Sequence, residues 1–385
     1  MKTISTGQQN TRSGNRYGRS EWAGAFGDLG TLIPFIVGYI SIVRMDPRGV
    51  LFMLGILLIG SGLYYKTPIP VQPMKAIGAA AIASSGAITP GMIWGAGLFT
   101  GVFWLSLGLS GQLVKVSKIA SKPVLRGIVL GLGLLFMMDG LNMMRKDFLV
   151  AGIALLLTFA LLKNKKVPAM FVLLIFGMTA AVLRNPAFLA EISKINLDIQ
   201  MPEVALGKIT VQEIIKGILL LGIPQIPLTF GNAVVAITSE NNRLFPAHPV
   251  NENKIAISQG IMNLISPLFG GIPVCHGAGG MAGHVRFGAR TGGALVILGG
   301  ILLATGIFFG SSVLLIFEIF PQSVLGVILF FAGLELAAPV WNAGMERKDQ
   351  YLLLVTAVFS LWNIGIGFAV GLILQELFNR KWIDI

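Results

Sequence analysis

Apolar segments alternate with short polar stretches along this chain in two series of seven, separated by a longer polar stretch. The first series falls within residues 21–184, the polar connection covers 185–210, and the second series falls within 211–385. Many segments approach the roughly 20 apolar residues that carry an α-helix across a bilayer. The pattern predicts an all-α, polytopic membrane protein of about 14 segments. We expect them at about 22–43, 49–65, 70–88, 91–113, 123–144, 148–162, 167–184, 211–238, 254–271, 273–288, 292–310, 321–342, 350–365 and 366–379.

The composition agrees with a lipid environment. Hydrophobic residues make up 54% of the chain and charged residues only 12%, about half the usual share in soluble proteins. The net charge of +12 does not indicate a nucleic-acid partner, because the basic residues stand singly between apolar runs rather than on one soluble face. Residues 1–20 are polar and of low complexity, which predicts a disordered tail rather than a cleaved signal peptide.

The loop charges predict an orientation. If the amino terminus is cytoplasmic, the even-numbered loops carry most of the basic residues, among them Lys115, Lys118 and Lys122, and the odd-numbered loops carry fewer. This is the asymmetry expected of cytoplasmic loops. We therefore expect both termini in the cytoplasm. The plasma membrane is the expected location, although the loop charges do not identify the membrane.

The third and tenth segments are short and open with matching proline-rich text. Residues 69–73 read IPVQP and residues 272–276 read IPVCH, about 203 positions apart, and a run of small residues follows each. Short, interrupted segments at corresponding places in two halves point to the binding site of a transporter. Because each half has an odd number of segments, the second half must be inverted, so we predict a 7+7 inverted repeat.

The chemistry of these two segments favours an anion. A helix that begins inside the membrane presents free N–H groups and a partial positive charge. The small residues Gly277, Ala278 and Gly279 would let an anion approach the backbone. Lys75 stands in the first turn after Pro73, where a cation is unfavourable unless an anion binds beside it. The alternatives are tight helix packing for the glycines and a lysine that reaches the interface.

Polar residues of other segments extend this hypothesis. Gln225, Thr229 and Asn232 share one helical face of the eighth segment and could either hold an oxyanion or join helices. Asp28, Glu335 and His276 are candidates for carrying a coupling proton, and H⁺ and Na⁺ are both open. Moving a dianion against 100 mV costs about 4.6 kcal/mol, so uptake needs a cation gradient.

An enzyme is not expected. Cys275 and His276 are adjacent, and adjacent residues on a helix do not face each other. With a single cysteine the chain has no internal disulfide, and the sequence offers no complete set of metal ligands. We predict no cofactor and no metal.

Residues 27–31 (GDLGT), 70–75 (PVQPMK), 273–280 (PVCHGAGG) and 286–290 (RFGAR) together resemble the molybdate transporter family, which is related to the SulP sulfate permeases. The resemblance implies a core of segments 1–4 and 8–11 and a gate of segments 5–7 and 12–14. It implies a substrate between the third and tenth segments, beside the first and eighth. SulP proteins usually add a cytoplasmic STAS domain, for which we expect no room before Ile385.

The predicted function is secondary-active transport of molybdate, coupled to H⁺ or Na⁺. A homodimer is one possible assembly of the protein. A sulfate permease, a carrier of nucleobases or other neutral solutes, a basic channel and a membrane-embedded Cys/His enzyme are the alternatives. The predicted substrate-binding residues are Gln72, Met74, Lys75, Gln225, Thr229, Asn232, Cys275, His276, Gly277, Ala278 and Gly279.

Overall fold

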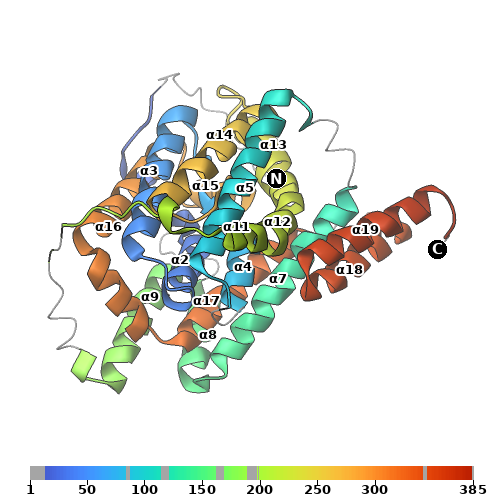
Figure 1. The fold of residues 1–385 in the computed structure, drawn as a ribbon. Helices are drawn as coiled ribbons and strands as arrows, with labels where there is room; N and C mark the ends of the chain where they lie inside the picture. Colours follow the sequence, from blue (N-terminus) through green and yellow to red (C-terminus); the bar gives the residue numbers. More distant parts are fainter. Residues whose placement is uncertain are drawn as a thin grey trace, which may run out of the picture.

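The computed structural model describes residues 14–83, 87–113, 121–161, 169–188, 197, 199–340 and 345–383, and these are almost entirely helical (Figure 1). The first series comprises α1 (Arg19–Ala25), η1 (Phe26–Asp28), α2 (Leu29–Val37), η2 (Gly38–Ile42), α3 (Pro47–Tyr65), β1 (Gln72–Pro73), α4 (Lys75–Ala83), α5 (Pro90–Ser110), α7 (Lys122–Met144), α8 (Phe148–Leu161) and α9 (Ala169–Arg184). The second comprises η3 (Leu206–Lys208), α11 (Val211–Gly217), η4 (Ile218–Gly222), α12 (Ile223–Leu228), η5 (Thr229–Ala236), α13 (Ile237–Leu244), α14 (Glu252–Ile265), η6 (Ser266–Phe269), β2 (Val274–Cys275), α15 (Ala278–Arg286), α16 (Gly293–Ile319), α17 (Gln322–Ala337), η7 (Ala338–Val340), α18 (Arg347–Trp362) and α19 (Ile364–Asn379).

Each expected segment coincides with one helical stretch or one strand–helix unit, which confirms the all-α fold. Within the described residues, six helical stretches are long and apolar enough to cross a membrane alone, and four shorter apolar helices accompany them. Large apolar side chains are exposed on the outer helices, including Leu109, Leu156, Leu183 and Trp362. Such surfaces are unfavourable in water and suit contact with lipid. Most of the tail predicted at residues 1–20 lies outside the described residues, whereas Asn15 donates to the carbonyl of Gly62 at 2.9 Å.

The first and eighth segments are continuous but irregular helices. The first runs from α1 to η2, and the eighth from α11 to α13. Pro34 lies within α2, and Pro224 and Pro227 lie within α12. Proline lacks an N–H group and its ring displaces the preceding turn, so the hydrogen-bond pattern of the helix changes nearby. The wider π turns η2, η4 and η5 flank these prolines and let each helix continue past them.

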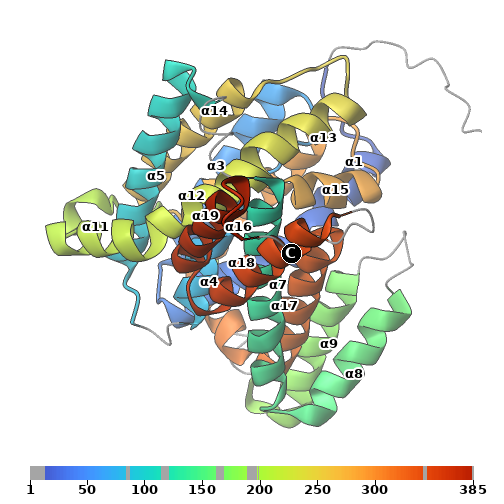
Figure 2. The same cartoon turned by 90° about the vertical axis from the view of Figure 1, so that its right-hand side faces the viewer.

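The helices pack as two bodies with reciprocal contacts between the two series. In the first body α3 packs on α16 and α5 packs on α14, which are corresponding pairs in the two series. In the second, α7 packs on α17 and α18, while α8 packs on α9 and α18 on α19. In both views α3, α5 and α14 lie at the top and α8, α9 and α17 at the bottom (Figures 1 and 2). The first body corresponds to the expected core and the second to the expected gate.

The two proline-rich segments meet inside the core. β1 and β2 pair antiparallel, with Gln72 opposite Cys275 and Pro73 opposite Val274. The N–H of Met74 also donates to the carbonyl of Pro273 at 2.9 Å. Each strand leads into a nine-residue helix, about 14 Å long and too short to cross about 30 Å of hydrocarbon. Each unit is thus a short strand followed by a short helix, and residues 68–71 and 271–273 before the strands are not helical.

Candidate functional site

The pairing of β1 with β2 gathers the predicted substrate-binding residues in one buried cluster. Asp28 at the end of η1, Gln72 on β1, Lys75 at the start of α4 and Gln225 on α12 are each no more than 5% exposed. Met74, Thr229, Cys275 and His276 are also buried. Two chain stretches about 200 residues apart thus supply one site.

Asp28 and Gln72 form the centre of this cluster. The Nε2 of Gln72 donates to Oδ1 and Oδ2 of Asp28 at 2.7 and 2.8 Å. The Oε1 of Gln72 is buried without a hydrogen-bond partner in the described part of the chain and faces Gly277, where a Cβ atom would overlap it. A Cβ atom on Gly280 would lie 2.7 Å from Oδ2 of Asp28. Both glycines are therefore required by the close approach of polar side chains.

Lys75 faces the beginning of α15. Its Nζ lies 3.9 Å from the position of a Cβ atom on Gly279. Lys75 forms no salt bridge within the described part of the chain, although Asp28 is close enough to interact with it electrostatically. A buried cation without a salt bridge is costly in a membrane, and an anion between Lys75 and α15 would lower that cost.

Gln225 occupies the N–H groups that the sequence assigns to an anion. Its Oε1 accepts from the amides of Ala76 and Ile77 at 2.8 and 3.2 Å, and its Nε2 donates to Thr229 Oγ1 at 2.8 Å. In this conformation Gln225 and Thr229 therefore cap α4 and join two helices. Asn232, on η5, lies close to Gly277 at the start of α15: its Nδ2 is 3.3 Å from the position of a Cβ atom on that glycine.

His276 is held by protein groups on both ring nitrogens. Nδ1 lies 2.8 Å from the carbonyl oxygen of Pro70, and Nε2 lies 2.8 Å from Ser258 Oγ, which is 2.5 Å from Tyr65 OH. The Tyr65 ring also packs edge-on against the imidazole, with centroids 5.5 Å apart. A carbonyl can only accept, so Nδ1 carries the proton in a neutral ring. These contacts favour a structural role for His276 in this conformation.

Sequence reading missed Asn263 and Gln259 of α14. Asn263 Oδ1 accepts from the Val274 amide at 2.8 Å, and its Nδ2 donates to the Val274 carbonyl at 2.7 Å. Gln259 Oε1 lies 3.5 Å from the His276 amide. The two amide side chains thus hold β2 from the side opposite β1. The available signal was a pair of polar residues four positions apart on an otherwise apolar helix.

Other predicted residues fall outside the cluster or outside the description. Glu335 lies on α17 in the gate, and its side chain is outside the described residues. Asp139 on α7, which the sequence reading did not single out, is a half-buried carboxylate within a membrane-spanning helix. In the described ranges, no three His, Cys, Asp or Glu side chains are grouped as they would be around a metal ion.

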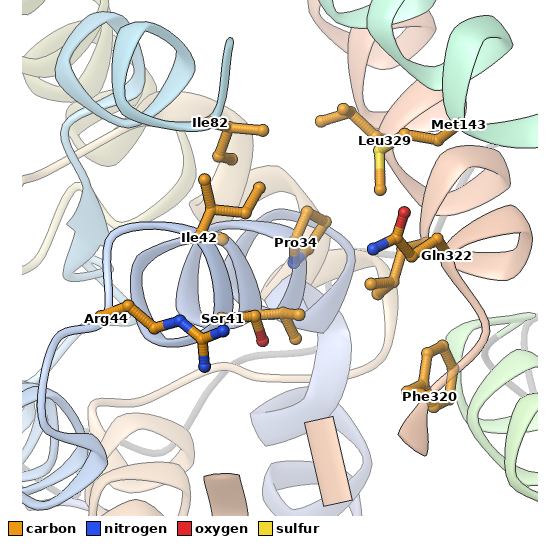
Figure 3. A pocket seen from close by; sticks show the side chains of 12 residues that line it. Pro34, Ser41, Ile42, Arg44, Ile82, Met143, Phe320, Gln322 and Leu329 are labelled. Carbon is orange, nitrogen blue, oxygen red and sulfur yellow. The ribbon is translucent and has the colours of Figure 1, made fainter. Parts of the chain in front are cut away.

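A cavity of about 290 Å³ opens between the core and the gate (Figure 3). The core side comes from α2, η2, Arg44 and Ile82 of α4, and the gate side from Met143 of α7 and the residues around the start of α17. None of the predicted substrate-binding residues lines it. The buried cluster and this cavity are therefore different places.

Comparison with known proteins assigns this arrangement to a family. The family model described as "Molybdate transporter of MFS superfamily" matches residues 20–136 and 217–336. "Molybdate transporter 2" of Arabidopsis thaliana is 31% identical and aligns with 95% of this chain and 88% of its own length. The "Putative sulfate transporter YvdB" of Bacillus subtilis is 26% identical over 74% of this chain and 58% of its own length.

The fold is that of known anion transporters. The murine Solute Carrier 26 family member A9 anion transporter, solved in an inward-facing state, superposes with a TM-score of 0.70 at 13% identity, covering 96% of this chain and 69% of that chain. This likeness establishes the 7+7 arrangement.

Proposed function

Because this chain belongs to the molybdate transporter family and has the fold of an anion transporter, we propose that it carries molybdate across the membrane by secondary-active transport. The observation that carries the proposal is Lys75, buried in the core and facing the first turn of α15 without a salt bridge in the described residues. A neutral solute would bring no negative charge to this buried cation.

The site would bind the dianion through two kinds of group. Lys75 contributes a full positive charge from α4, and the start of α15 contributes amide N–H groups and the helix dipole. Among the described residues, no side chain caps α15 at Gly277. Gly279 and Ala278 carry no large side chain, so an anion could approach the backbone closely. Asn232 Nδ2 lies beside Gly277 and would offer amide N–H groups to the substrate oxygens, whereas Gln72 Nε2 donates to Asp28.

The position of Asp28 supports the proposal that transport is coupled to protons. A dianion held beside an ionised carboxylate suffers repulsion, and a proton on Asp28 would remove it. Asp28 and Lys75 interact electrostatically, so anion binding at Lys75 and proton binding at Asp28 would favour each other. The proton would also offset part of the roughly 4.6 kcal/mol that a dianion requires against 100 mV.

Movement of the core against the gate would expose the site alternately to the two sides. The substrate-binding residues all lie in the core, so they would travel with it while α7 and α17 remain in place. We further propose that both termini are cytoplasmic, that the membrane is the plasma membrane, and that the assembly is a homodimer. Protease accessibility of terminal tags and cross-linking in the native membrane test these points.

Sulfate is the second candidate substrate. A relative from Bacillus subtilis is described as a putative sulfate transporter, and sulfate has the same charge and tetrahedral shape as molybdate. The two would differ only in size and in the reach of their oxygens to Lys75 and the amides.

Uptake into proteoliposomes tests the proposal. Radiolabelled molybdate is offered with unlabelled sulfate or uracil as competitor, under an imposed pH gradient or sodium gradient. We expect accumulation above equilibrium with an inward proton gradient, strong competition by sulfate, and none by uracil. Competition by uracil alone would indicate a neutral-solute carrier, and molybdate flux that never exceeds equilibrium under either gradient would indicate a channel.

A further inference from the structure

We propose that the cavity between η2 and α17 is a second, outer binding site for tetrahedral oxyanions. The substrate would bind there before it moves to the site at Lys75. The inference rests on the proposed function for the identity of the anion. The volume of about 290 Å³ far exceeds the roughly 10–15 Å³ that one water needs. It can therefore admit a small anion with part of its hydration shell.

The polar groups that line the cavity suit an anion. Arg44 brings a guanidinium group from the core side, and Ser41 brings a hydroxyl whose Oγ is buried without a hydrogen-bond partner among the described residues. None of the twelve lining residues is acidic. A guanidinium group forms strong, charge-assisted hydrogen bonds with oxyanions, and a hydroxyl can donate one further hydrogen bond.

The gate side contributes an oriented amide. Gln322 Oε1 accepts a hydrogen bond from Lys146 Nζ, so its Nε2 remains as the donor end. Figure 3 shows this nitrogen turned toward Pro34 and the cavity, opposite Ser41 and Arg44. Lys146 thereby adds a second cation at the edge of the site. An anion held between Arg44 and Gln322 would bridge the core and the gate.

The local backbone explains why these groups converge. The π turn η2 covers Gly38–Ile42, and Gly38, Ser41 and Ile42 all line the cavity. Arg44 follows with a φ of 62°, a left-handed conformation that is costly for a residue with a side chain. Both features are uncommon and concentrate at functional sites.

The cavity and the central cluster lie at opposite ends of one helix. α4 begins at Lys75, and Ile82 near its other end lines the cavity. Seven residues of helix correspond to about 10 Å. The odd-numbered loops that carry Arg44 and Lys146 are those assigned to the outside by the loop charges, so the outer site would capture anions from the external solution.

Thiol labelling tests the outer site directly. The chain has one cysteine, Cys275, which is buried, so the parent should not react with a membrane-impermeant, negatively charged methanethiosulfonate reagent added outside. Ser41 is only partly buried and lines the cavity, so Ser41→Cys should react, and molybdate or sulfate should slow the reaction at least about fivefold, whereas gluconate should not. Gln322→Cys, on the gate side, repeats the measurement if Ser41→Cys does not fold.

A second variant separates the two sites. Protection of Ser41→Cys should persist when Lys75→Gln is added, because the anion then still occupies the outer cavity. Protection that disappears with Lys75→Gln would mean that molybdate acts only from the central site, and labelling unaffected by molybdate in both variants would overturn the proposal. Absence of molybdate uptake by the parent would instead refute the proposed function, since protection is read without transport.

Kinetics give an independent readout. Arg44→Gln should raise the apparent KM for molybdate about tenfold, as expected for loss of one charge-assisted contact, with a maximal rate within about twofold of the parent. Arg145→Gln is the matched control, because Arg145 is exposed at the end of α7 and does not line the cavity. Equal effects of the two substitutions would reduce the role of Arg44 to general surface charge.

Discussion

The beginnings of α4 and α15 are related by the repeat but differ in chemistry. α4 starts with a cation, Lys75, and two of its first amides are occupied by Gln225. α15 starts after Gly277, carries no charged residue in its first turn, and has no side-chain cap from the residues that the structure describes. The repeat therefore duplicates the architecture, while the two helix starts differ in what they could offer the proposed anion: α4 could offer charge and α15 could offer open backbone.

Reversing the charge on the α4 side should have the largest effect. Lys75→Glu places a carboxylate beside the bound dianion and beside Asp28, so we expect molybdate uptake to fall below about 1% of the parent. Lys75→Arg, which keeps the charge, should retain measurable uptake. If Lys75→Glu takes up molybdate like the parent, the start of α4 does not bind the substrate, and the proposed difference between α4 and α15 is wrong.

Filling the α15 side should come next. A Cβ atom on Gly277 would overlap Gln72 Oε1, so Gly277→Ala must displace Gln72 or shift β2. We expect a loss of about 1–3 kcal/mol in stability and at least about tenfold lower uptake, measured by thermal unfolding in detergent and by proteoliposome assay. Gly300→Ala on α16 is the control, because nothing lies within 4 Å of its added methyl group. Normal uptake by Gly277→Ala would mean that the α15 backbone is not approached closely.

Asp28 lies close to Gly280 of α15 and interacts electrostatically with Lys75 of α4, and we expect it to determine coupling rather than binding. Asp28→Asn keeps an acceptor for Gln72 Nε2 but cannot release a proton. We expect accumulation driven by a proton gradient to disappear, while exchange of internal for external molybdate continues at a rate within about fivefold of the parent.

Glu21→Gln provides the matched control for that experiment. Glu21 is a buried carboxylate near the beginning of the same segment, and it accepts from the amides of Arg290 and Thr291 at 3.0 Å. Its loss should lower stability without abolishing accumulation. Gradient-driven accumulation that survives in Asp28→Asn would assign coupling to another group.

The meeting of the two starts could be predicted because proline makes it visible in the sequence. The IPVQP and IPVCH motifs occupy corresponding positions in the two series. The pairing of Pro73 with Val274 confirms that the third and tenth segments meet. The number and order of the apolar segments were equally predictable, since hydrophobic length is set by the bilayer rather than by neighbouring residues.

The difference between the two starts could not be predicted. Gln225 lies about 150 residues from the amides that it caps, and nothing local distinguishes a cap from a substrate donor. The support of β2 by Asn263 likewise depends on how α14 is rotated against β2. The outer cavity depends on a π turn that shifts Ser41 and Arg44 by part of a turn, and a hydrophobic pattern does not encode that shift.

Removing the α4 cap should have the smallest effect and is the most discriminating test. Gln225→Leu deprives Ala76 and Ile77 of an acceptor, which should lower stability by about 1 kcal/mol. If the α4 amides serve only the fold, the apparent KM for molybdate should stay within about twofold of the parent. Thr229→Val, which removes only the partner of Gln225 Nε2, should do less still. A KM for molybdate raised about tenfold or more by Gln225→Leu, with stability preserved, would indicate that Gln225 contributes to substrate binding. The starts of α4 and α15 would then both take part in binding.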